Sequence, residues 1–499
     1  MDAITTDINH TGRGSPPICL YQQRLPPDVF ILLVCIGFLI LGYLFYSKFV
    51  ERSILPFREP TPAVSVNDGM DYVPMPTWKT HLIELLNIAG TGPIFGALMG
   101  AKWGPIVFIW IVGGTILGGA VHDYMSGMMS VRNNGASATW LTKHYLFGKS
   151  RYPILVLGVF LLLMVSATFA RSAGDLLESI TGMPLTIWVV VILAYFALSA
   201  VLPINKVIGR IYPVFGVLLI TMVVVVIAGL VVGGYAFPSF TLENLHPTGA
   251  SYFPDMFITV ACGAISGFHA TQSPMIARCI KHEKDGRPVF YGAMIVESII
   301  AAMWAAAGLA FYAGTTGLTD ALAESGPAGV VYDICTTVAG PIGGALAVIG
   351  VLICPITSGD TALRSARMMI QDDRELDRSD RRKMVLVTLI MFAFIAIMCT
   401  LDFSILWNYF SWLNQTLAAI VLWTATAFLF TTSKKRYTLI TALPALFMTM
   451  VVSSFIFHSN LGLNLDDSIA MPLGGIVTAI MAVLYLRFLF MKGPMPQAT

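Results

Sequence analysis

The sequence predicts an all-α polytopic membrane protein of about thirteen transmembrane helices, built as a five-plus-five inverted repeat with one extra N-terminal and two extra C-terminal helices. Three observations lead to this prediction. Hydrophobic residues make up 56% of the chain and charged residues only 12%, whereas soluble domains carry about 25% charged residues. Apolar runs recur along all 499 residues, and most approach the roughly 20 residues that cross a bilayer. Two of these runs are interrupted by glycine and proline at related positions.

The spans are bounded by charged residues, glycine and proline. Their expected limits are 29–47, 80–100, 105–126, 152–171, 184–202, 211–233, 255–277, 290–313, 331–356, 384–401, 405–431, 438–457 and 472–491. The corresponding regions are an extracytoplasmic segment 1–28, a first helix 29–49, a cytoplasmic loop 50–79, repeats 80–233 and 255–431, and C-terminal helices 438–491.

The distribution of basic residues predicts the orientation of the chain. With the N-terminus outside and alternating loops, 26 of the 30 Lys and Arg residues fall on the cytoplasmic side, as the positive-inside rule requires. The loops 234–254 and 314–330, which contain no basic residue, are placed outside. We therefore expect an integral plasma (inner) membrane protein with a cytoplasmic C-terminus.

The first interrupted segment reads "NIAGTGPIFG" (87–96), and the second reads "ACGAISGFHATQSP" (261–274). They lie five spans apart, so they cross the membrane in opposite directions. Unwound backbone at membrane depth survives only where a cavity, ion or substrate meets it; the alternative is that these glycines serve close helix packing. The residues predicted to bind substrate are Asn87, Ala89, Gly90, Thr91, Gly92, Gly263, Ser266, Gly267, His269 and Gln272.

Ionisable residues inside spans are functional candidates because burying them is costly. Asp360 is placed at the cytoplasmic end of the ninth span, where it is predicted to couple transport to an ion or proton together with Thr357, Ser358 and Thr361. The alternative for Asp360 is an ion pair with Arg364, one turn away. Four further residues are candidates for a gate or for structural ion pairs: His81, Glu84, His122 and Asp123.

Other patterns argue against further kinds of site. Asn414 and Gln415 suit either a cavity lining or bonds between helices. The seven cysteines are scattered and mostly in apolar runs, so we expect them to be buried packing residues. No zinc-type His/Cys spacing, P-loop or GxSxG motif is present. We therefore expect no enzyme activity, no metal and no cofactor beyond a coupling H⁺ or Na⁺, with the bilayer and a small molecule as partners and no nucleic acid.

Several motifs resemble the carbon starvation protein A (CstA) family. They are "TPAVSVNDGMDYVP" (61–74), "HLIELLNIAGTGPIFG" (81–96), "GGAVHDYMSGMMSVRNNGAS" (118–137), "SGFHATQSP" (266–274), "TSGDTALRSARMMIQD" (357–372) and "LNQTLAAIVLW" (413–423). The better-known members are longer, so the chain resembles a short-form member. The resemblance implies an inner-membrane transporter of pyruvate or peptides under nutrient limitation. It also implies the amino acid–polyamine–organocation transporter fold, in which Thr357 and Ser358 would contribute hydroxyls to a cation site.

These observations favour a cation-coupled symporter for a small organic nutrient, pyruvate-like or a short peptide, working by alternating access between the two interrupted spans. Three alternatives remain open: an amino-acid or other organic-acid carrier of the same fold, a passive channel, and a nutrient sensor. The sequence patterns identify neither the substrate, nor the coupling ion, nor the oligomeric state.

Overall fold

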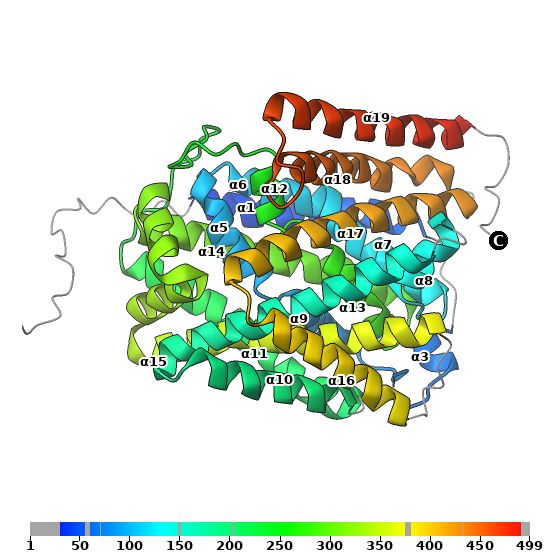
Figure 1. Ribbon diagram of the computed structural model, residues 1–499, viewed down its shortest axis with the longest axis horizontal. Helices are drawn as coiled ribbons and strands as arrows, with labels where there is room; N and C mark the ends of the chain where they lie inside the picture. Colours follow the sequence, from blue (N-terminus) through cyan, green and yellow to red (C-terminus); the bar gives the residue numbers. More distant parts are fainter. Residues whose placement is uncertain are drawn as a thin grey trace, which may run out of the picture.

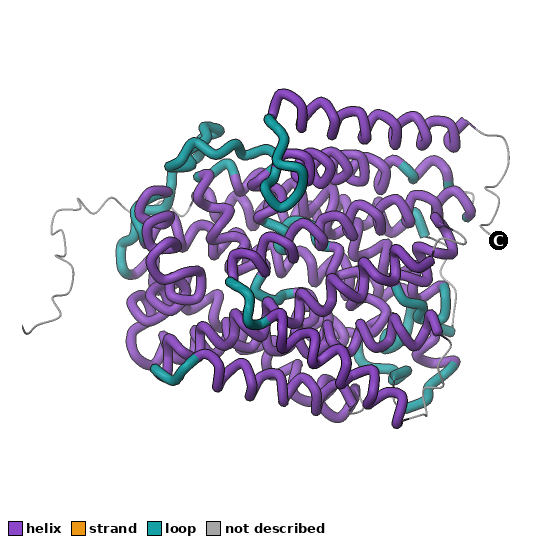
Figure 2. The backbone as a smooth tube through the Cα atoms, viewed as in Figure 1, coloured by secondary structure: helices purple, strands orange, loops and turns teal. Residues whose placement is uncertain are grey.

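The computed structural model describes residues 30–54, 60–69, 71–147, 151–201, 204–374, 381–432 and 434–490. This part of the chain is helical, with a single isolated bridge between Met75 and Ile280 in place of any strand. Most long helices run along the longest axis of the molecule, and the connecting loops lie toward the two ends (Figures 1 and 2). The expected segment 1–28 lies outside the described residues. The all-α membrane fold predicted from the composition is confirmed.

The first half of the described chain forms the following elements: α1 (Phe30–Leu41), η1 (Gly42–Tyr46), α2 (Ser47–Glu51), α3 (Pro62–Ser65), α4 (Thr77–Ile88), η2 (Gly92–Gly96), α5 (Ala97–Gly100), η3 (Ala101–Trp103), α6 (Val107–Ile109), η4 (Trp110–Gly119), α7 (Ala120–Arg132), α8 (Ala138–Thr142), η5 (Lys143–Phe147), α9 (Arg151–Thr181), α10 (Leu185–Val201) and α11 (Ile204–Val232). Elements marked η are π or 3₁₀ turns, and several continue an α-helix without a bend.

The second half follows with α12 (Asp255–Thr259), α13 (Gly267–Ala277), η6 (Glu283–Asp285), η7 (Arg287–Tyr291), α14 (Gly292–Phe311), α15 (Thr315–Arg374), α16 (Arg381–Met398), α17 (Phe403–Thr431), η8 (Lys435–Tyr437), α18 (Leu439–His458) and α19 (Asp467–Phe490). Within the described ranges, nine helices are long and apolar enough to cross a membrane. A tenth span results if the bent pair Thr77–Ile88 and Gly92–Trp103 is counted as one. The predicted number of thirteen and the inverted repeat stay predictions.

Both interrupted segments are broken helices. The first bends by 59° between Thr77–Ile88 and Gly92–Trp103. The second consists of α12 and α13, separated by a non-helical stretch, 260–266. Glycine and proline lower helix stability at these positions, and neighbouring side chains supply the hydrogen bonds that the unwound backbone needs.

The region around α15 differs from the sequence prediction in two ways. Residues 314–330, expected to be a loop, are largely helical, and α15 is kinked at Gly326 and Gly340. The ninth span, expected at 331–356, is Gly343–Gln371. The C-terminal end of this span lies later than predicted, because the positive charges of Arg364 and Arg367 favour a cytoplasmic loop when only the sequence is considered. In the fold these two side chains are only 1% and 5% exposed, so the helix continues past them.

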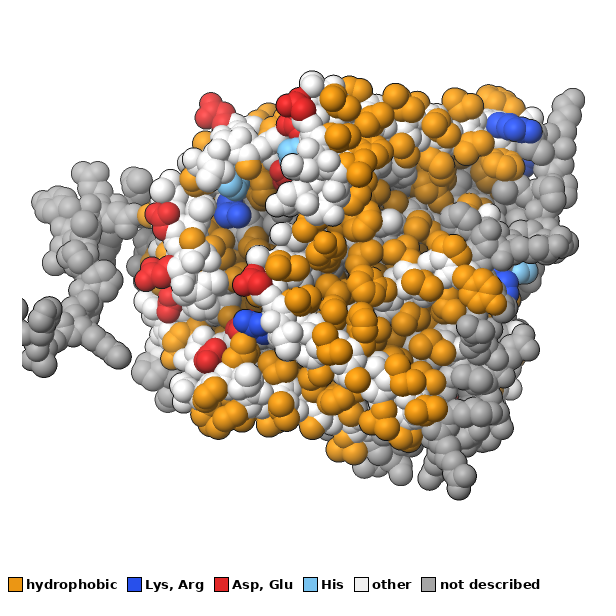
Figure 3. Space-filling model, in the orientation of Figure 1, with side chains coloured by type: hydrophobic (Ala, Val, Ile, Leu, Met, Phe, Trp, Pro, Cys, Tyr) orange, Lys and Arg blue, Asp and Glu red, His pale blue; other side chains and the backbone are white. Residues whose placement is uncertain are grey.

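The core lies where α13 and α14 pack against α4 and α7, while α9, α11 and α15 form an adjoining layer. Helices α18 and α19 pack on the outside next to α17 (Figure 1). The outer faces carry exposed apolar side chains such as Val190, Val232 and Val483. In Figure 3 hydrophobic side chains form a broad region across the middle of the visible face. An apolar surface of this kind is compatible with the hydrocarbon core of a bilayer, which offers no hydrogen-bond partners to polar groups.

Close packing around η4 supports a first prediction. A Cβ added to Gly119 would lie 2.1 Å from the carbonyl oxygen of Ala264, which is backbone and cannot move aside. We expect Gly119→Ala to lower the free energy of unfolding by about 1–3 kcal/mol, as overpacking of a tight core does. A lower melting temperature of the purified chain in detergent is the measurement.

Gly113→Ala is the matched control, because Gly113 lies in the same element and a Cβ there meets nothing within 4 Å. This control is expected to leave the melting temperature unchanged or slightly raised, since alanine is the better helix former. Equal melting temperatures for the two variants would contradict the packing argument.

Candidate functional site

The two helix breaks lie against each other. A Cβ added to Gly92 in the first break would lie 2.1 Å from the Cβ of Cys262 in the second. Gly263 has φ +87°, a conformation that disfavours other residues, and a Cβ on it would lie 3.5 Å from the Cα of Pro93. All four residues are buried. A ligand bound at one break would therefore also be close to the other.

Side chains of neighbouring helices form hydrogen bonds with backbone groups within the second break and at the helix ends on either side of it. Thr115 in η4 donates a hydrogen bond to the carbonyl oxygen of Gly263 (3.1 Å). In α17, the side-chain oxygen of Asn414 accepts from the backbone N–H of Phe268 (2.6 Å), and Gln415 donates to a carbonyl of α12. The structure thus places both amides between helices, one of the two roles that the sequence left open.

At the first break, hydroxyl groups of α15 meet a carbonyl of α4. In a continuous helix the Leu86 carbonyl would accept from the N–H of Gly90, but that N–H bonds to Ile88 instead (2.8 Å). Ser358 Oγ and Thr357 Oγ1 lie 2.9 and 3.3 Å from the Leu86 oxygen. Three uncharged oxygen atoms therefore converge beside the break, and such oxygens are the ligands that hard cations prefer.

A row of polar side chains without hydrogen-bond partners leads along α4 into the first break. Glu84, Asn87 and Thr91 are fully buried. Both carboxylate oxygens of Glu84, both polar atoms of the Asn87 amide and the Thr91 hydroxyl lack a hydrogen bond. An unsatisfied buried polar group costs about 1–3 kcal/mol. Three of them in succession indicate a place where a ligand supplies the missing partners.

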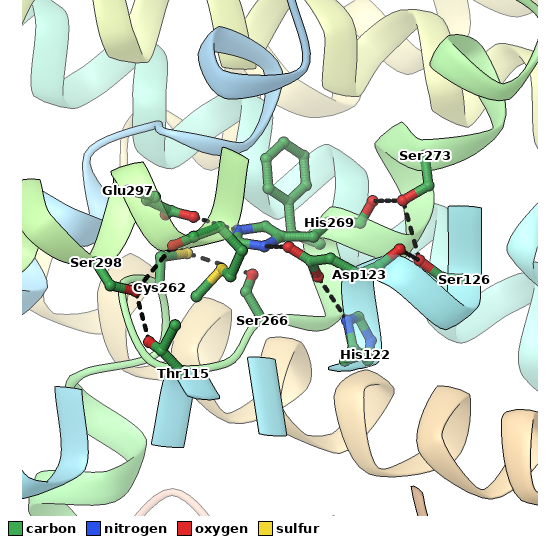
Figure 4. Close-up of polar contacts among 12 residues, drawn as sticks. Thr115, His122, Asp123, Ser126, Cys262, Ser266, His269, Ser273, Glu297 and Ser298 are labelled. Carbon is green, nitrogen blue, oxygen red and sulfur yellow. Dashed lines mark hydrogen bonds and ion pairs between the residues drawn. The ribbon is translucent and has the colours of Figure 1, made fainter. Parts of the chain in front are cut away.

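Next to this row, an acid–histidine cluster joins α7, the second break and α14 (Figure 4). His269 Nδ1 lies 2.8 Å from Asp123 Oδ2, and the other oxygen of Asp123 lies 2.8 Å from His122 Nδ1. On its far side, His269 Nε2 lies 3.4 Å from Glu297 Oε2. Cys262, His269 and Glu297 each offer one donor atom, and these atoms lie within 4.8 Å of one another. Every residue of this cluster is fully buried.

Asp360 of α15 belongs to a second network, which it forms with α10 and α11. Its Oδ2 accepts hydrogen bonds from Ser199 Oγ (2.7 Å) in α10 and from the Tyr212 hydroxyl (3.0 Å) in α11. Arg364 donates to the backbone carbonyl of Ser199 (2.6 Å). The Tyr212 hydroxyl also lies 3.2 Å from the Thr357 carbonyl. One tyrosine thus connects Asp360 to the backbone of Thr357, the residue whose hydroxyl belongs to the oxygen cluster at the first break.

The remaining predicted residues divide between the breaks and their surroundings. Gln272 lies on α13, where its amide donates to Thr271 (2.8 Å). Thr361 donates to the Ser358 carbonyl (3.2 Å), and His81 Nδ1 lies 2.7 Å from the carbonyl of Pro288, which joins α4 to η7. The structure gathers at the two breaks Asn87, Ala89, Gly90, Thr91, Gly92, Gly263, Ser266, Gly267 and His269.

Residues 71–74 of the motif "NDGMDYVP" lie at one end of the second broken span. The Tyr72 hydroxyl donates to the Asn134 carbonyl (2.8 Å), and the Val73 N–H bonds to the Arg278 carbonyl (3.2 Å). Arg278 Nε in turn donates to the Gly135 carbonyl (2.9 Å). These bonds hold the end of α13 against the loop that follows α7.

Sequence reasoning missed several residues of the site. Glu297 is a single carboxylate within an apolar run, a signal that could have identified it. Cys262 is buried, as predicted for the cysteines, and its place in the second interrupted segment is the signal that could have added it to the site. Ser199 and Tyr212 carry no local signal, because only the fold brings α10 and α11 next to Asp360.

A cavity of about 520 Å³ lies elsewhere, between η4, α12 and α18. Its walls are apolar side chains such as Trp110, Phe257, Leu443 and Phe447, and the second break contributes only the apolar Ile265 to them. The unpartnered polar side chains Glu84, Asn87 and Thr91 do not line it. A polar ligand needs a few placed polar groups for orientation. We therefore assign the candidate site to the breaks and not to this cavity.

The chain is similar to known proteins in sequence and in fold. The family model described as carbon starvation protein CstA matches residues 28–187, 172–314 and 313–454. An uncharacterized membrane protein of Haemophilus influenzae is 40% identical over 344 residues, 58% of this chain and 92% of that protein. The pyruvate/proton symporter BtsT of Escherichia coli is 26% identical, over 55% of this chain and 48% of the symporter. The peptide transporter CstA of Bacillus subtilis is 28% identical, over 55% and 57% respectively.

The alignments therefore span about half the length of the two named transporters. Among solved structures, MhsT in complex with L-phenylalanine has a TM-score of 0.52 at 14% identity, covering 83% of this chain and 98% of that one. A manganese transporter of Eremococcus coleocola has a TM-score of 0.51 at 12% identity, covering 85% and 97%. At these identities the likeness concerns the fold, which is that of helical membrane transporters.

Proposed function

Because the chain belongs to the carbon starvation protein CstA family, we propose that it is a cation-coupled symporter that takes up a small organic nutrient across the inner membrane. Its named relatives are transporters: one is a pyruvate/proton symporter, and others are peptide transporters. The substrate proposed first is pyruvate or a short peptide, each of which carries a carboxylate.

One observation carries the proposal: the two broken helices touch, and unsatisfied polar groups of the first break lie beside that contact. Discontinuous helices that meet at mid-membrane are the usual substrate site of secondary transporters. Asn87 and Thr91 offer an amide and a hydroxyl without partners, which suits a carboxylate or a peptide group. Gly92 allows the two broken segments to approach each other closely, because a side chain there would meet Cys262.

Coupling is proposed to involve the oxygen cluster of Leu86, Thr357 and Ser358 together with Asp360. A cation at this cluster would hold α4 against α15, so its binding would favour one arrangement of the first broken helix. Asp360, reached through Tyr212, would supply the negative charge or take up the coupling proton. Binding of the cation and of the substrate would then be linked through the same short helix break.

The orientation proposed for the chain has the N-terminus outside and the C-terminus in the cytoplasm. It is supported by the basic residues, because this orientation places 26 of the 30 Lys and Arg residues on the cytoplasmic side. A cysteine introduced at Asp466 should react with a membrane-impermeant reagent in intact cells, and one at Lys435 should not. The reverse labelling would refute this orientation.

The test of the function is uptake into proteoliposomes with an imposed pH or Na⁺ gradient, using labelled pyruvate first and then dipeptides and amino acids. The symporter should accumulate one of these substrates above equilibrium, and an ionophore that collapses the gradient should abolish the accumulation. If only an amino acid accumulates, that amino acid replaces pyruvate or a peptide as the proposed substrate. Equilibration without accumulation or counterflow would indicate a channel, and no transport of any of them would refute the proposal.

A further inference from the structure

We propose that Cys262, His269 and Glu297 form a binding site for a divalent transition metal ion of the Zn²⁺ class. The proposal does not depend on the nature of the transported substrate. It concerns the cluster at the second break, and it departs from the expectation, based on spacing in the sequence, that the chain holds no metal.

The donor set is the first argument. A thiolate, an imidazole and a carboxylate are the three ligand types that Zn²⁺ takes in proteins. In a tetrahedral site with metal–ligand distances of 2.0–2.3 Å, the ligand atoms lie about 3.3–3.6 Å apart. His269 Nε2 and Glu297 Oε2 already lie 3.4 Å apart. All three donor atoms lie within 4.8 Å of one another, so a small side-chain movement of Cys262 would complete the site.

The orientation of the histidine is the second argument. A metal-binding imidazole usually donates its other N–H to a carboxylate, which fixes the ring and its tautomer. His269 Nδ1 faces Asp123 Oδ2 at 2.8 Å, and Asp123 is itself held by His122 at 2.8 Å. Nε2 is thereby directed to the space between Cys262 and Glu297, as Figure 4 shows. Asp123 and His122 are positioning residues in this arrangement.

The unsatisfied atoms are the third argument. Both carboxylate oxygens of Glu297 and Nε2 of His269 are fully buried without a well-formed hydrogen bond. The neighbouring Glu84 lies within electrostatic reach of His269 and Glu297, and its two oxygens also lack a hydrogen bond. Buried carboxylates are normally paired with cations or bound to metals. Among the described residues, no Lys or Arg forms an ion pair with Glu84, Asp123 or Glu297.

Local backbone explains how the three ligands meet. Cys262 lies in the non-helical stretch 260–266, His269 lies in the first turn of α13, and Glu297 lies in the second turn of α14. A metal ion here would bind the unwound segment to α14. Three protein ligands leave a fourth position open, which Glu84, water or a carboxylate of a ligand at the breaks could take. The Cys262 thiol would release its proton on binding, because the thiolate is the ligand.

The test uses the full-length chain, purified in detergent and loaded with Zn²⁺ or Co²⁺. Metal analysis after dialysis should give about one ion per chain. The Co²⁺ form should show the near-ultraviolet charge-transfer band of a cobalt–thiolate bond, and Cys262→Ser should abolish this band. Cys335→Ser is the matched control, since Cys335 is equally buried but lies in α15; it should leave the band unchanged.

Affinity measured by competition with a chelating dye separates ligands from positioning residues. Cys262→Ser and Glu297→Gln should each weaken Zn²⁺ binding at least tenfold, and Asp123→Asn should weaken it about 10- to 100-fold while the band remains. Melting temperatures with and without Zn²⁺ establish that each variant is folded. The proposal is overturned if the wild-type chain holds no more metal than the Cys262→Ser/Glu297→Gln double variant, or if the cobalt band survives in Cys262→Ser. Either result would leave proton binding by these carboxylates as the explanation of the cluster.

Discussion

Replacing Asp360 by Asn is expected to abolish gradient-driven accumulation of substrate, with uptake falling at least a hundredfold. Asparagine has nearly the same shape and can still accept hydrogen bonds from Ser199 and Tyr212, but it can neither carry a charge nor exchange a proton. The measurement is accumulation of labelled substrate in proteoliposomes under the gradient that drives the wild-type chain.

Counterflow without a gradient is the informative second readout for Asp360→Asn. If Asp360 takes part in coupling, exchange of labelled for unlabelled substrate should continue while accumulation is lost. If Asp360 only balances Arg364, the variant removes the negative charge beside the buried guanidinium, and loss of a buried counter-charge costs about 3–5 kcal/mol. Exchange and thermal stability would then fall together, and the coupling role would be refuted. Asp175→Asn is the control, because that carboxylate is partly exposed beside Arg171 and such pairs contribute little.

The helix breaks were predictable from the sequence because their cause is local. Glycine and proline within an apolar run weaken a helix whatever surrounds it, so both interruptions could be located before the fold was known. Their contact could not be located in this way. That Gly92 lies against Cys262 depends on how α4, α13 and α14 pack, and no spacing in the sequence encodes it.

Charge was a less reliable guide at the ends of helices. Arg364 and Arg367 indicated a cytoplasmic loop, and the ninth span was therefore placed too early. Their side chains are buried because the fold supplies partners, such as the Ser199 carbonyl for Arg364. The same reason explains the polar neighbours of Asp360. The sequence indicated the hydroxyls next to it in the chain, whereas its closest hydroxyls come from α10 and α11.

Asn87→Leu tests the site at the first break most directly, because binding and stability should change in opposite directions. The Asn87 amide is fully buried and none of its polar atoms is hydrogen-bonded. Replacing an unsatisfied polar group by an apolar one of similar size should keep or raise the melting temperature. If this amide binds substrate, the lost hydrogen bonds should raise KM about 10- to 100-fold.

Asn408→Leu, on an exposed face of α17, provides the control for Asn87→Leu and should change neither quantity. A purely structural role for Asn87 would give the reverse pattern, with a lower melting temperature and an unchanged KM for the molecules that remain folded. The reason is that a structural amide must have partners in the protein, and this one has none in the arrangement described here. The Asn87 amide can therefore form hydrogen bonds only when another molecule or ion lies beside the break. The changes in melting temperature and in KM of Asn87→Leu decide whether that molecule is the substrate.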